Sequence, residues 1–333
     1  MDIGVVIPFF QRSAEVLQRS LRSIAAQRLP DGVRVRVVLV DDESPLPADQ
    51  ALGDFILPSP HTLDVLRQPN GGPGAARNTG LDHLSADPPE LVAFLDSDDE
   101  WRPDHLAHAV ADLGQDADFF FCDHDRWYDE KSWFSASEQF QSWLTGKEEA
   151  PFRQITGTAD KFEMLKGRAR FAFVMDYLAQ TSTVVYRFSR IPDLRFDPQL
   201  RHAGEDNMFW LELAGAARLT RFTMARDVVC GEGVNMFFSS SDWTHPDAVR
   251  RLGYSLLFYL RAERRFREDS VAMVAIKRRA WTYQKMVVRV WAARLVKNRR
   301  LNASIMRTLM AERPALAATL PLALAAAVVK PKF

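Results

Sequence analysis

The 333-residue sequence predicts an α/β fold, a Rossmann-like and mostly parallel sheet flanked by helices, followed by a helical C-terminal extension. Three observations lead to this fold. Short apolar runs alternate with helical patterns over the first 125 residues, two of these runs end abruptly in aspartates, and helical patterns continue almost unbroken beyond residue 247. We expect one domain over residues 1–245 and a helical, basic region over residues 246–333.

Five apolar runs predict the strands, at residues 3–7, 33–40, 63–66, 91–95 and 117–122. Ser13 can cap a first helix, and Pro73 suits the first turn of a helix that continues to residue 84. Further along we expect irregular structure over 125–170, a strand over 181–187 and a short helix over 204–215. Ligands of such sheets bind beyond the carboxyl ends of the strands, so we expect the functional site there.

Composition restricts the class of protein. About half of the residues are apolar and the formal net charge is zero, so a substantial core is expected. Cys122 and Cys230 lie far apart without metal-ligand spacing and are interpreted as reduced, cytosolic thiols. The N-terminus lacks a signal-peptide pattern, and no apolar stretch reaches the roughly 18 residues expected of a membrane span. We therefore expect a cytoplasmic protein.

The strongest chemical signal follows the fourth apolar run, where Asp96, Asp98 and Asp99 lie within four residues. Carboxylates crowded at a strand end repel one another and raise their pKa values unless a cation or strong donors relieve the repulsion. A hard divalent cation relieves it, and Mg²⁺ needs only one or two carboxylates besides water and phosphate oxygens. The alternative is a solvated cap, with Asp98 or Asp99 at the start of a helix near Pro103.

Two further segments carry polar groups at the ends of strands. Asp41 and Asp42 end the second run, where a carboxylate can accept from a base N–H or a ribose hydroxyl, or can serve turn chemistry. The glycines of residues 71–74 resemble a dinucleotide-binding pattern, but Arg77 occupies its third glycine position. A guanidinium there can pair with phosphate or with an acidic strand end, and the alternative is a surface ion pair.

A fourth segment, GEDNMFW, places Glu205 and Asp206 at the start of a helix that buried aromatic residues would anchor. The helix dipole keeps such a carboxylate ionised, as a general base requires, although acidic residues are common in first turns. The following glycine-containing stretch, with Asn235 and Trp243, suggests a loop that closes over a ligand. His245 is interpreted as a helix-start residue more readily than as an extra metal ligand.

In order along the chain, VVIPFFQR, VDDES, GGPGAARNTG, FLDSDDEW and GEDNMFW resemble the motifs of family 2 glycosyltransferases with the GT-A fold. The resemblance covers residues 3–240 and includes a subtler likeness of the GEGVN segment to bacterial exopolysaccharide transferases. It implies a nucleotide-sugar donor, weighted toward UDP, and a saccharide or lipid-linked saccharide acceptor. The signature of processive synthases, Gln-X-X-Arg-Trp, is absent, which favours transfer of one sugar per encounter.

The resemblance also implies roles for individual residues. Pro8 and Phe9 would flank the nucleotide base, which Asp41 or Asp42 would read. Arg77 would face the diphosphate. Asp96 and Asp98 match the family's Asp-X-Asp motif, with Asp98 the expected direct ligand of Mg²⁺ or Mn²⁺ and Asp99 alongside. Glu205, Asn235 and Trp243 would serve the acceptor or the loop that closes over it. Asp206 matches the proposed catalytic base, and with one base and one displacement the anomeric centre inverts. The residues concerned are Pro8, Phe9, Asp41, Asp42, Arg77, Asp96, Asp98, Asp99, Glu205, Asp206, Asn235 and Trp243.

Three questions stay open at this point. Aromatic residues between 125 and 170 form either a packed surface excursion or part of an acceptor site, since sugars stack on aromatic rings. Residues 261–307 contain fourteen Lys or Arg against three acidic residues, which suggests contact with an anionic membrane or a solvated basic face, and no nucleic-acid motif accompanies them. The rival functions are a nucleotidyltransferase and a binding scaffold without catalysis.

Overall fold

The computed structural model describes residues 1–231, 248–296, 303–318 and 321. The chain divides into two compact units. The first unit comprises residues 1–198 and 209–234, and the second comprises 199–208 and 235–333. The boundary expected at residue 245 falls among residues that the structure does not describe, so that boundary stays a prediction.

The elements of the first unit alternate between strands and helices for the first half of the chain. Its strands are β1 (Asp2–Phe9), β2 (Arg34–Asp41), β3 (Thr62–Arg67), β4 (Leu91–Phe94), β5 (Glu100–Trp101), β6 (Phe119–Arg126), β7 (Phe152–Gln154), β8 (Lys161–Met164), β9 (Val185–Tyr186) and β10 (Thr220–Cys230). Its helices are α1 (Ala14–Ala25), α2 (Ala48–Leu52), α3 (Pro73–Ser85), α4 (His105–Leu113), α5 (Trp133–Ala136), α6 (Glu138–Leu144), α7 (Ala169–Met175), the 3₁₀ turns η1 (Thr181–Thr183) and η2 (Phe188–Arg190), and most of α8 (Glu205–Ala216).

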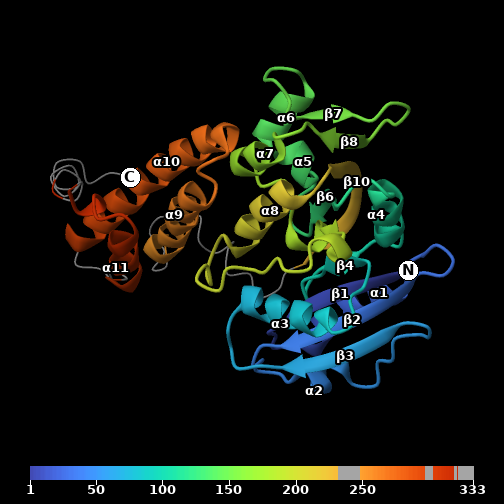
Figure 1. Cartoon of the computed structure of the whole chain (residues 1–333). Coiled ribbons are helices and arrows are strands. Elements are labelled where there is room, and N and C mark those ends of the chain that lie inside the picture. Colours follow the sequence, from blue (N-terminus) through green and yellow to red (C-terminus); the bar gives the residue numbers. More distant parts are fainter. Residues whose placement is uncertain (232–247, 297–302, 319–320, 322–333) are drawn as a thin grey trace. The chain divides into compact units, whose positions relative to one another are not determined.

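One sheet contains all of these strands, in the order β3-β2-β1-β4-β9-β6-β10-β8-β7, with β5 paired to β10. The pairs among β3, β2, β1 and β4 are parallel, and so is the pair of β6 and β10. Figure 1 shows β1, β2 and β3 side by side with their arrowheads pointing the same way. The short strand β9 is antiparallel to both β4 and β6, so β4 and β6 run in the same direction.

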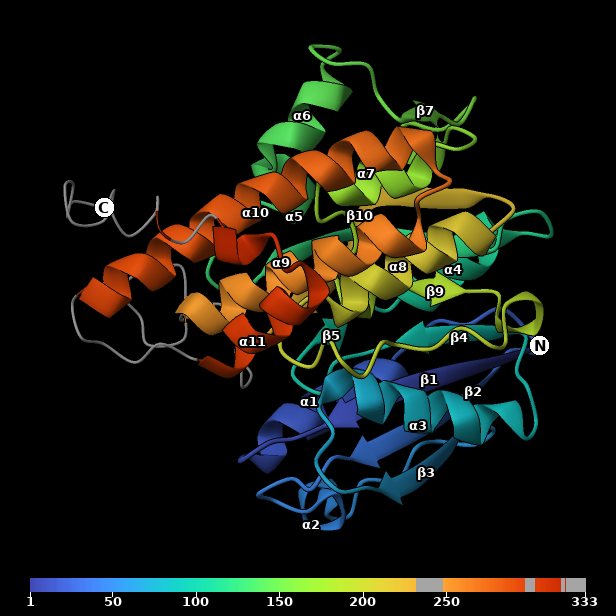
Figure 2. The same cartoon turned by 60° about the vertical axis from the view of Figure 1, so that its left-hand side comes forward.

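Helices cover both faces of the N-terminal half of this sheet. Ile3, Val5 and Ile7 of β1 lie in one apolar core with the buried face of α1. On the opposite face, α3 approaches so closely that a Cβ at Gly80 would lie 2.5 Å from Val6 Cγ1. In Figure 2, α3 lies in front of β1 and β2. The predicted α/β fold with a sheet covered on both faces is thus confirmed.

The structure also corrects three local expectations. Residues 125–170 are not irregular, because they contain two helices, the hairpin of β7 and β8, and the start of α7. Residues 181–187 form a 3₁₀ turn followed by a strand of only two residues, and not one continuous strand. The long strand β10, which none of the five apolar runs predicts, pairs with β6 and extends the sheet.

The second unit is helical where it is described. Its helices are α9 (Ala248–Arg265), α10 (Ser270–Val296) and α11 (Ala303–Glu312), and both α10 and α11 pack against α9. This agrees with the helical C-terminal extension that the sequence predicts. No helix among the described residues is both long enough and apolar enough to cross a membrane.

Candidate active site

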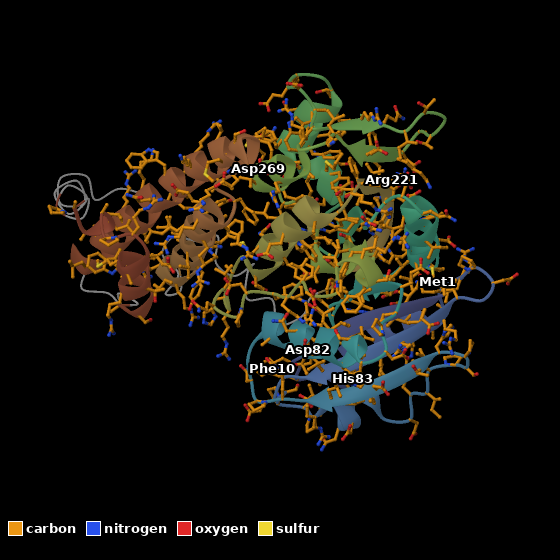
Figure 3. All side chains as sticks on the ribbon, in the orientation of Figure 1. Met1, Phe10, Asp82, His83, Arg221 and Asp269 are labelled. Carbon is orange, nitrogen blue, oxygen red and sulfur yellow. The ribbon has the colours of Figure 1, made fainter. Side chains whose placement is uncertain are left out.

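The carboxyl ends of β1, β2, β4, β6 and β10 meet at one edge of the sheet, because these strands run in the same direction. Met1 and Phe10, labelled in Figure 3, mark the two ends of β1, and Phe10 lies at this edge. The two predicted aspartate clusters follow β2 and β4 and therefore share the edge. We call this the strand-end site.

Asp96, Asp98 and Asp99 lie in the turn after β4 with different surroundings. The Asp96 carboxylate accepts from Arg77 Nη2 at 2.6 Å and from Gln180 Nε2 at 3.3 Å. The Asp98 residue is partly exposed, and its backbone carbonyl accepts from Arg19 Nη2 at 3.0 Å. The sequence predicts this cluster correctly at the strand end, and the structure distinguishes its members by burial.

The carboxylate of Asp99 points into the protein. It accepts from Gln180 Nε2 at 2.7 Å, from Ser182 Oγ at 2.6 Å and from the backbone N–H of Gly231 at 2.9 Å. Burial raises its pKa well above the usual range, and the neighbouring charges of Asp98 and Asp96 raise it further. In this conformation Asp99 fixes the turn, while its role beside a metal stays a prediction.

Arg77 is buried, and its guanidinium lies 5.3 Å from the centroid of the Phe196 ring while it pairs with Asp96. The expected interaction with an acidic strand end is therefore present, and the alternative of a surface ion pair is wrong. Phe196 stacks in turn on Phe209 of α8, with ring centroids 4.2 Å apart. This packing holds a cation beneath the strand-end aspartates, where negative charge would otherwise be uncompensated.

The glycine-rich segment before Arg77 serves helix packing. Gly74 and Gly80 are buried residues of α3, and small side chains let this helix approach β1 closely. Asn78 holds the helix to the chain at Phe196, donating through Nδ2 to its carbonyl and accepting from its N–H. These contacts account for the glycines of the helix without a dinucleotide.

Asp41 and Asp42 are both buried and both hydrogen-bonded to backbone N–H groups. Asp41 accepts from Ser44 N at 2.7 Å and from Ala48 N at 2.9 Å. Asp42 accepts from Gly71 N at 2.7 Å and from Gly72 N at 2.8 Å, which joins the end of β2 to the start of α3. Both carboxylates thus hydrogen-bond to the backbone of nearby turns, and recognition of a nucleotide base by either of them stays a prediction.

Several groups at this edge were not predicted from the sequence. Gln11 receives a hydrogen bond from Ser44 Oγ through its backbone carbonyl and donates through Nε2 to Ser97 Oγ at 3.1 Å, so it connects the ends of β1, β2 and β4. Glu43 has a φ of 58°, an uncommon conformation for a residue other than glycine. Such strain is often found at functional sites and is invisible in a single sequence.

Gly231, directly after β10, approaches the aspartate turn more closely than any side chain would allow. A Cβ at this position would lie 1.9 Å from the Asp98 backbone carbonyl oxygen and 2.7 Å from Arg19 Nη2. A glycine is therefore required here by space. The sequence predicts a loop at this point, and the structure explains why the first residue of the loop is a glycine.

Pro8 and Phe9 are buried at the end of β1, and Phe9 belongs to the core behind the sheet. Phe10, the next ring, is 38% exposed at the strand-end site. Contact of Pro8 and Phe9 with a base stays a prediction. Phe10 is thus a further aromatic residue at the end of β1, and unlike Phe9 it is partly in solvent.

Glu205 and Asp206 occupy the first turn of α8, as predicted, and both are partly exposed. Asp206 Oδ1 accepts from Asn207 N at 2.7 Å. Both acidic residues belong to the second unit, so their convergence with Asp98 stays a prediction. Asn235, Trp243 and His245 lie outside the described residues.

The strand-end carboxylates have the chemistry that a hard divalent cation requires. Asp98 is partly exposed, and the pKa of the neighbouring Asp99 is raised first by burial and then by the like charges of Asp98 and Asp96. One or two such carboxylates suffice when phosphate and water complete the shell. The residues present therefore fit Mg²⁺ or Mn²⁺, and the role of Asp98 as a metal ligand stays a prediction.

A different group of metal-ligand types is found inside the core. Among the described residues, His105, Cys122 and Asp227 have ligand atoms within 4.8 Å of one another, and all three are buried. His105 Nδ1 lies 3.7 Å from Cys122 Sγ, and the ring packs on Trp101. We interpret this group as a packed polar cluster. The two cysteines are free thiols, as expected.

The alternative interpretation, in which Asp98 or Asp99 caps a helix near Pro103, is wrong. The strand β5 follows the aspartates, and α4 begins at His105 after the N-cap residue Asp104. The turn is instead closed by the backbone bond from Asp99 N to the Asp96 carbonyl at 3.0 Å. A short strand between the aspartates and the helix leaves the carboxylates at the sheet edge.

Comparisons with known proteins agree with this geometry. The model of the family "Glycosyl transferase family 2" matches residues 4–174. The succinoglycan biosynthesis protein ExoW of Rhizobium meliloti (strain 1021) is 34% identical over 314 residues, which cover 90% of each chain. The minor teichoic acid biosynthesis protein GgaA of Bacillus subtilis (strain 168) is 30% identical over 37% of this chain and 25% of its own.

Two solved structures have the same fold at lower identity. S. aureus TarS 1–349 in complex with UDP-GlcNAc gives a TM-score of 0.59 at 19% identity, covering 97% of this chain and 89% of that one. The mannosyltransferase PcManGT from Pyrobaculum calidifontis, in complex with GDP-Man and Mn²⁺, gives 0.51 at 19% identity over 98% and 86%. With the family model and ExoW, these findings lead to one conclusion: the chain belongs to glycosyltransferase family 2 and has the GT-A fold.

Proposed function

We propose that this glycosyltransferase moves a single sugar from a nucleotide-sugar, UDP-linked, to a hydroxyl of a saccharide or lipid-linked saccharide, with inversion and with a divalent cation. The observation that carries the proposal is the strand-end site. There Asp98 is partly exposed beside the ion pair of the buried Arg77 and the partly exposed Asp96, at the same edge as Asp41 and Asp42. Such an edge is suited to a ligand that combines phosphates with a base.

The leaving group is a nucleoside diphosphate on which negative charge builds as the sugar departs. A divalent cation held by Asp98, with Asp99 alongside, would supply Lewis-acid neutralisation of that charge. Arg77 adds a fixed positive charge whose position is set by Asp96 and the Phe196 ring. Asp99 holds the turn in place through Gln180, Ser182 and Gly231.

Asp206 accepts the proton of the attacking acceptor hydroxyl in this proposal. Its place in the first turn of α8 keeps the carboxylate ionised, because the helix dipole favours negative charge there. A single displacement with one base inverts the anomeric centre and needs no protein nucleophile. Glu205, Asn235 and Trp243 are proposed to serve the acceptor or to close over it.

The relatives support a proposal for the donor and for the biological role. ExoW is named for succinoglycan biosynthesis, TarS is solved with UDP-GlcNAc, and PcManGT is solved with GDP-Man and Mn²⁺. We propose a role in exopolysaccharide or glycoconjugate biosynthesis with a UDP-sugar and Mg²⁺ or Mn²⁺. We also propose a cytoplasmic location, which the free thiols Cys122 and Cys230 support.

A nucleotide-sugar panel tests this proposal. We expect one nucleotide-sugar to raise the melting temperature in the presence of Mn²⁺, and we expect transfer with that donor to release a nucleoside diphosphate. EDTA should abolish transfer. Release of a nucleoside monophosphate and pyrophosphate would instead identify a nucleotidyltransferase, and donor binding without any turnover would identify a binding scaffold.

We further propose that the second unit contacts an anionic membrane surface through the predicted segment 261–307, using one face of α10. Val274 is 70% exposed and Trp281 is 55% exposed on this face. Lys277, Arg278 and Lys285 are exposed beside them, and Lys285 Nζ lies 5.6 Å from the centroid of the Trp281 ring. Apolar residues interleaved with cations are typical of helices that lie at a membrane surface.

The opposite face of α10 is buried, with Ile276, Ala280 and Val287 inside the second unit. The helix therefore has one buried face, which packs against α9, and one exposed face. Figure 2 shows α10 running along α9. Among the described carboxylates, none forms an ion pair with Lys277, Arg278 or Lys285, which suits a partner that supplies negative charge.

Sedimentation with vesicles tests this contact. We expect the full chain to pellet with phosphatidylglycerol vesicles and not with phosphatidylcholine vesicles, and we expect the double variant Arg278→Glu/Lys285→Glu to lose binding. Lys147→Glu/Lys166→Glu changes the net charge equally at exposed positions of the first unit and serves as the matched control. Equal loss in both variants would contradict a specific role of α10.

A further inference from the structure

An exposed aromatic pair lies directly after β6. Trp127 is 53% exposed and Tyr128 is 46% exposed, and their ring centroids are 5.5 Å apart at an interplanar angle of 84°. Two large rings left half in solvent suggest that a ligand covers them. We call Trp127, Tyr128, Arg126 and Trp133 the aromatic platform.

The rings are supported from below. The Arg126 guanidinium lies 3.8 Å from the centroid of the Trp133 ring, and its Nη1 donates to Tyr128 Oη at 3.0 Å. Trp133 stacks on His124, with centroids 5.7 Å apart, and its indole N–H donates to the Tyr177 carbonyl. The platform is therefore positioned by named contacts and is not a pair of loose side chains.

A short chain of hydrogen bonds joins the platform to the strand-end site. Arg126 pairs in register with Cys230, and the next residue, Trp127, donates through its backbone N–H to the Cys230 carbonyl at 3.3 Å. Gly231 follows Cys230 and donates to Asp99 Oδ1 at 2.9 Å. Only these two backbone contacts separate Trp127 from the aspartate turn, so a ligand on the platform lies beside the place where the donor sugar is expected.

Charge around the platform disfavours an anionic ligand. The nearby carboxylate of Asp125 is paired with Arg102 at 2.8 Å and with Arg226 at 3.2 Å. The Arg126 guanidinium is covered by the Trp133 ring and bonded to Tyr128. The exposed residues that follow the two rings, Asp129, Glu130 and Lys131, carry more negative than positive charge. Exposed aromatic faces with a phenol suit a ligand that has both C–H and hydroxyl groups.

We propose that the aromatic platform is the acceptor subsite, and that it binds a neutral pyranose whose C–H face stacks on Trp127 and Tyr128. The hydroxyl groups around the rim of the pyranose stay free, so that one of them can face the donor sugar. The assignment as an acceptor subsite rests on the proposed transferase function. The binding of the saccharide itself does not depend on the donor or the cation. It names the class of acceptor, a saccharide presenting a flat apolar face.

Saturation-transfer difference NMR on the full chain tests the platform directly. The probes are neutral disaccharides, cellobiose, laminaribiose, gentiobiose and lactose, with irradiation of the aromatic protons. We expect transfer to the ring C–H protons of at least one disaccharide, and we expect at least a fivefold smaller effect in Trp127→Ala/Tyr128→Ala. Trp127→Phe, which keeps a ring, should retain most of the effect.

Two controls separate this proposal from the transferase proposal. Ile56→Ala removes another exposed apolar side chain, 84% exposed, and should leave saturation transfer within twofold of the wild type. Asp98→Asn should also leave it unchanged while it abolishes sugar transfer. Absence of saturation transfer to any disaccharide in the wild type, or full retention in Trp127→Ala/Tyr128→Ala, would overturn the acceptor subsite and leave the assignment of the strand-end site intact.

Discussion

Two adjacent aspartates, Asp98 and Asp99, differ in what surrounds their carboxylates. Asp99 is 3% exposed and accepts from two side chains and one backbone N–H, whereas Asp98 is partly exposed. Replacing Asp99 with Asn leaves only one acceptor oxygen for these donors, because the amide NH₂ group cannot accept a hydrogen bond. A buried donor left unsatisfied costs about 1–3 kcal/mol.

We therefore expect Asp99→Asn to lower the free energy of unfolding by about 1–3 kcal/mol in urea titrations. The matched variant Asp98→Asn should retain the stability of the wild type and lose at least about 100-fold in transfer rate, as loss of a transition-state contact can cost. If Asp98→Asn were the destabilised variant and Asp99→Asn the stable one, the division of roles would be reversed.

Gly231→Ala tests the close approach of β10 to the aspartate turn. The added Cβ would lie 1.9 Å from the Asp98 carbonyl oxygen, so the backbone of one segment must move. We expect a loss of about 1–3 kcal/mol in unfolding free energy, as in other overpacked sites, together with loss of transfer. Gly146→Ala, whose Cβ would meet no atom within 4 Å but whose φ of 72° strains a side chain, should lose some stability and retain transfer.

Single residues also mark where prediction from sequence stops. Asp96, Asp98 and Arg77 were predictable because each belongs to a local pattern after a strand or in the first turns of a helix. Gln180, Ser182 and Gly231 were not, since they reach Asp99 from positions at least 81 residues away along the chain. A contact of that kind depends on the tertiary structure and leaves no local signal.

At the scale of elements, the packing of α3 on β1 determines where Arg77 lies. Gly80 faces Val6, and any side chain at residue 80 would overlap it. We expect Gly80→Val to be strongly destabilised, by about 1–3 kcal/mol or more. The double variant Gly80→Ala/Val6→Ala should recover part of the stability lost in Gly80→Ala, measured by thermal unfolding, and Asp82→Ala on the same helix is the control. Absence of rescue would show that α3 is held by other contacts.

Two buried histidines give the fold a pH dependence. Burial lowers the pKa of His105 on α4 and of His124 on β6 to about 3, against about 6.5 in an unfolded chain. Between these values the unfolded state binds more protons, so stability is complete above about pH 6.5 and falls as the pH decreases, by about 1.4 kcal/mol per pH unit for each histidine.

Urea titrations between pH 7.5 and pH 5.5 check this dependence. We expect His105→Phe to show a shallower loss of stability on acidification than the wild type. The variant His83→Phe, at a partly exposed histidine, should match the wild type. The comparison with variants is needed because buried carboxylates such as Asp123 and Asp227, whose pKa values burial raises, act in the opposite sense. Identical slopes for all three proteins would contradict the assignment.

The elements of the first half of the chain were predictable because buried parallel strands are continuous apolar runs. Residues 125–170 were interpreted as irregular, yet they fold into α5, α6 and the β7–β8 hairpin. Their order comes from aromatic packing around Phe222 of β10, which Phe134, Phe140 and Phe152 contact. A set of rings spread along the chain gives no periodic signal, so their assembly became visible only in the structure.

For the whole molecule, the fold class and the family were both expected from the order of the five motifs, and both are confirmed. The division of the chain was less predictable. Residues 199–208, which include Asp206 and the start of α8, group with the second unit, whereas the rest of α8 belongs to the first.

The proposed role of Asp206 as the base gives a prediction. If it is the base, Asp206→Asn should bind the donor with unchanged affinity, measured by calorimetry, and lose at least about 100-fold in transfer. Glu205→Gln, one residue earlier in the same helical turn, is the matched control and should lose much less. Transfer at the native rate in Asp206→Asn would exclude this residue as the base.

The central claim is that the strand-end site carries out one inverting displacement of a nucleoside diphosphate from a sugar. The most direct measurement is NMR of the reaction with the donor selected by the thermal-shift panel, an acceptor saccharide and Mn²⁺. We predict a nucleoside diphosphate as leaving group and a glycosidic bond of the opposite anomeric configuration to the donor. A product with the donor's configuration retained, or release of a nucleoside monophosphate with pyrophosphate, would contradict the account.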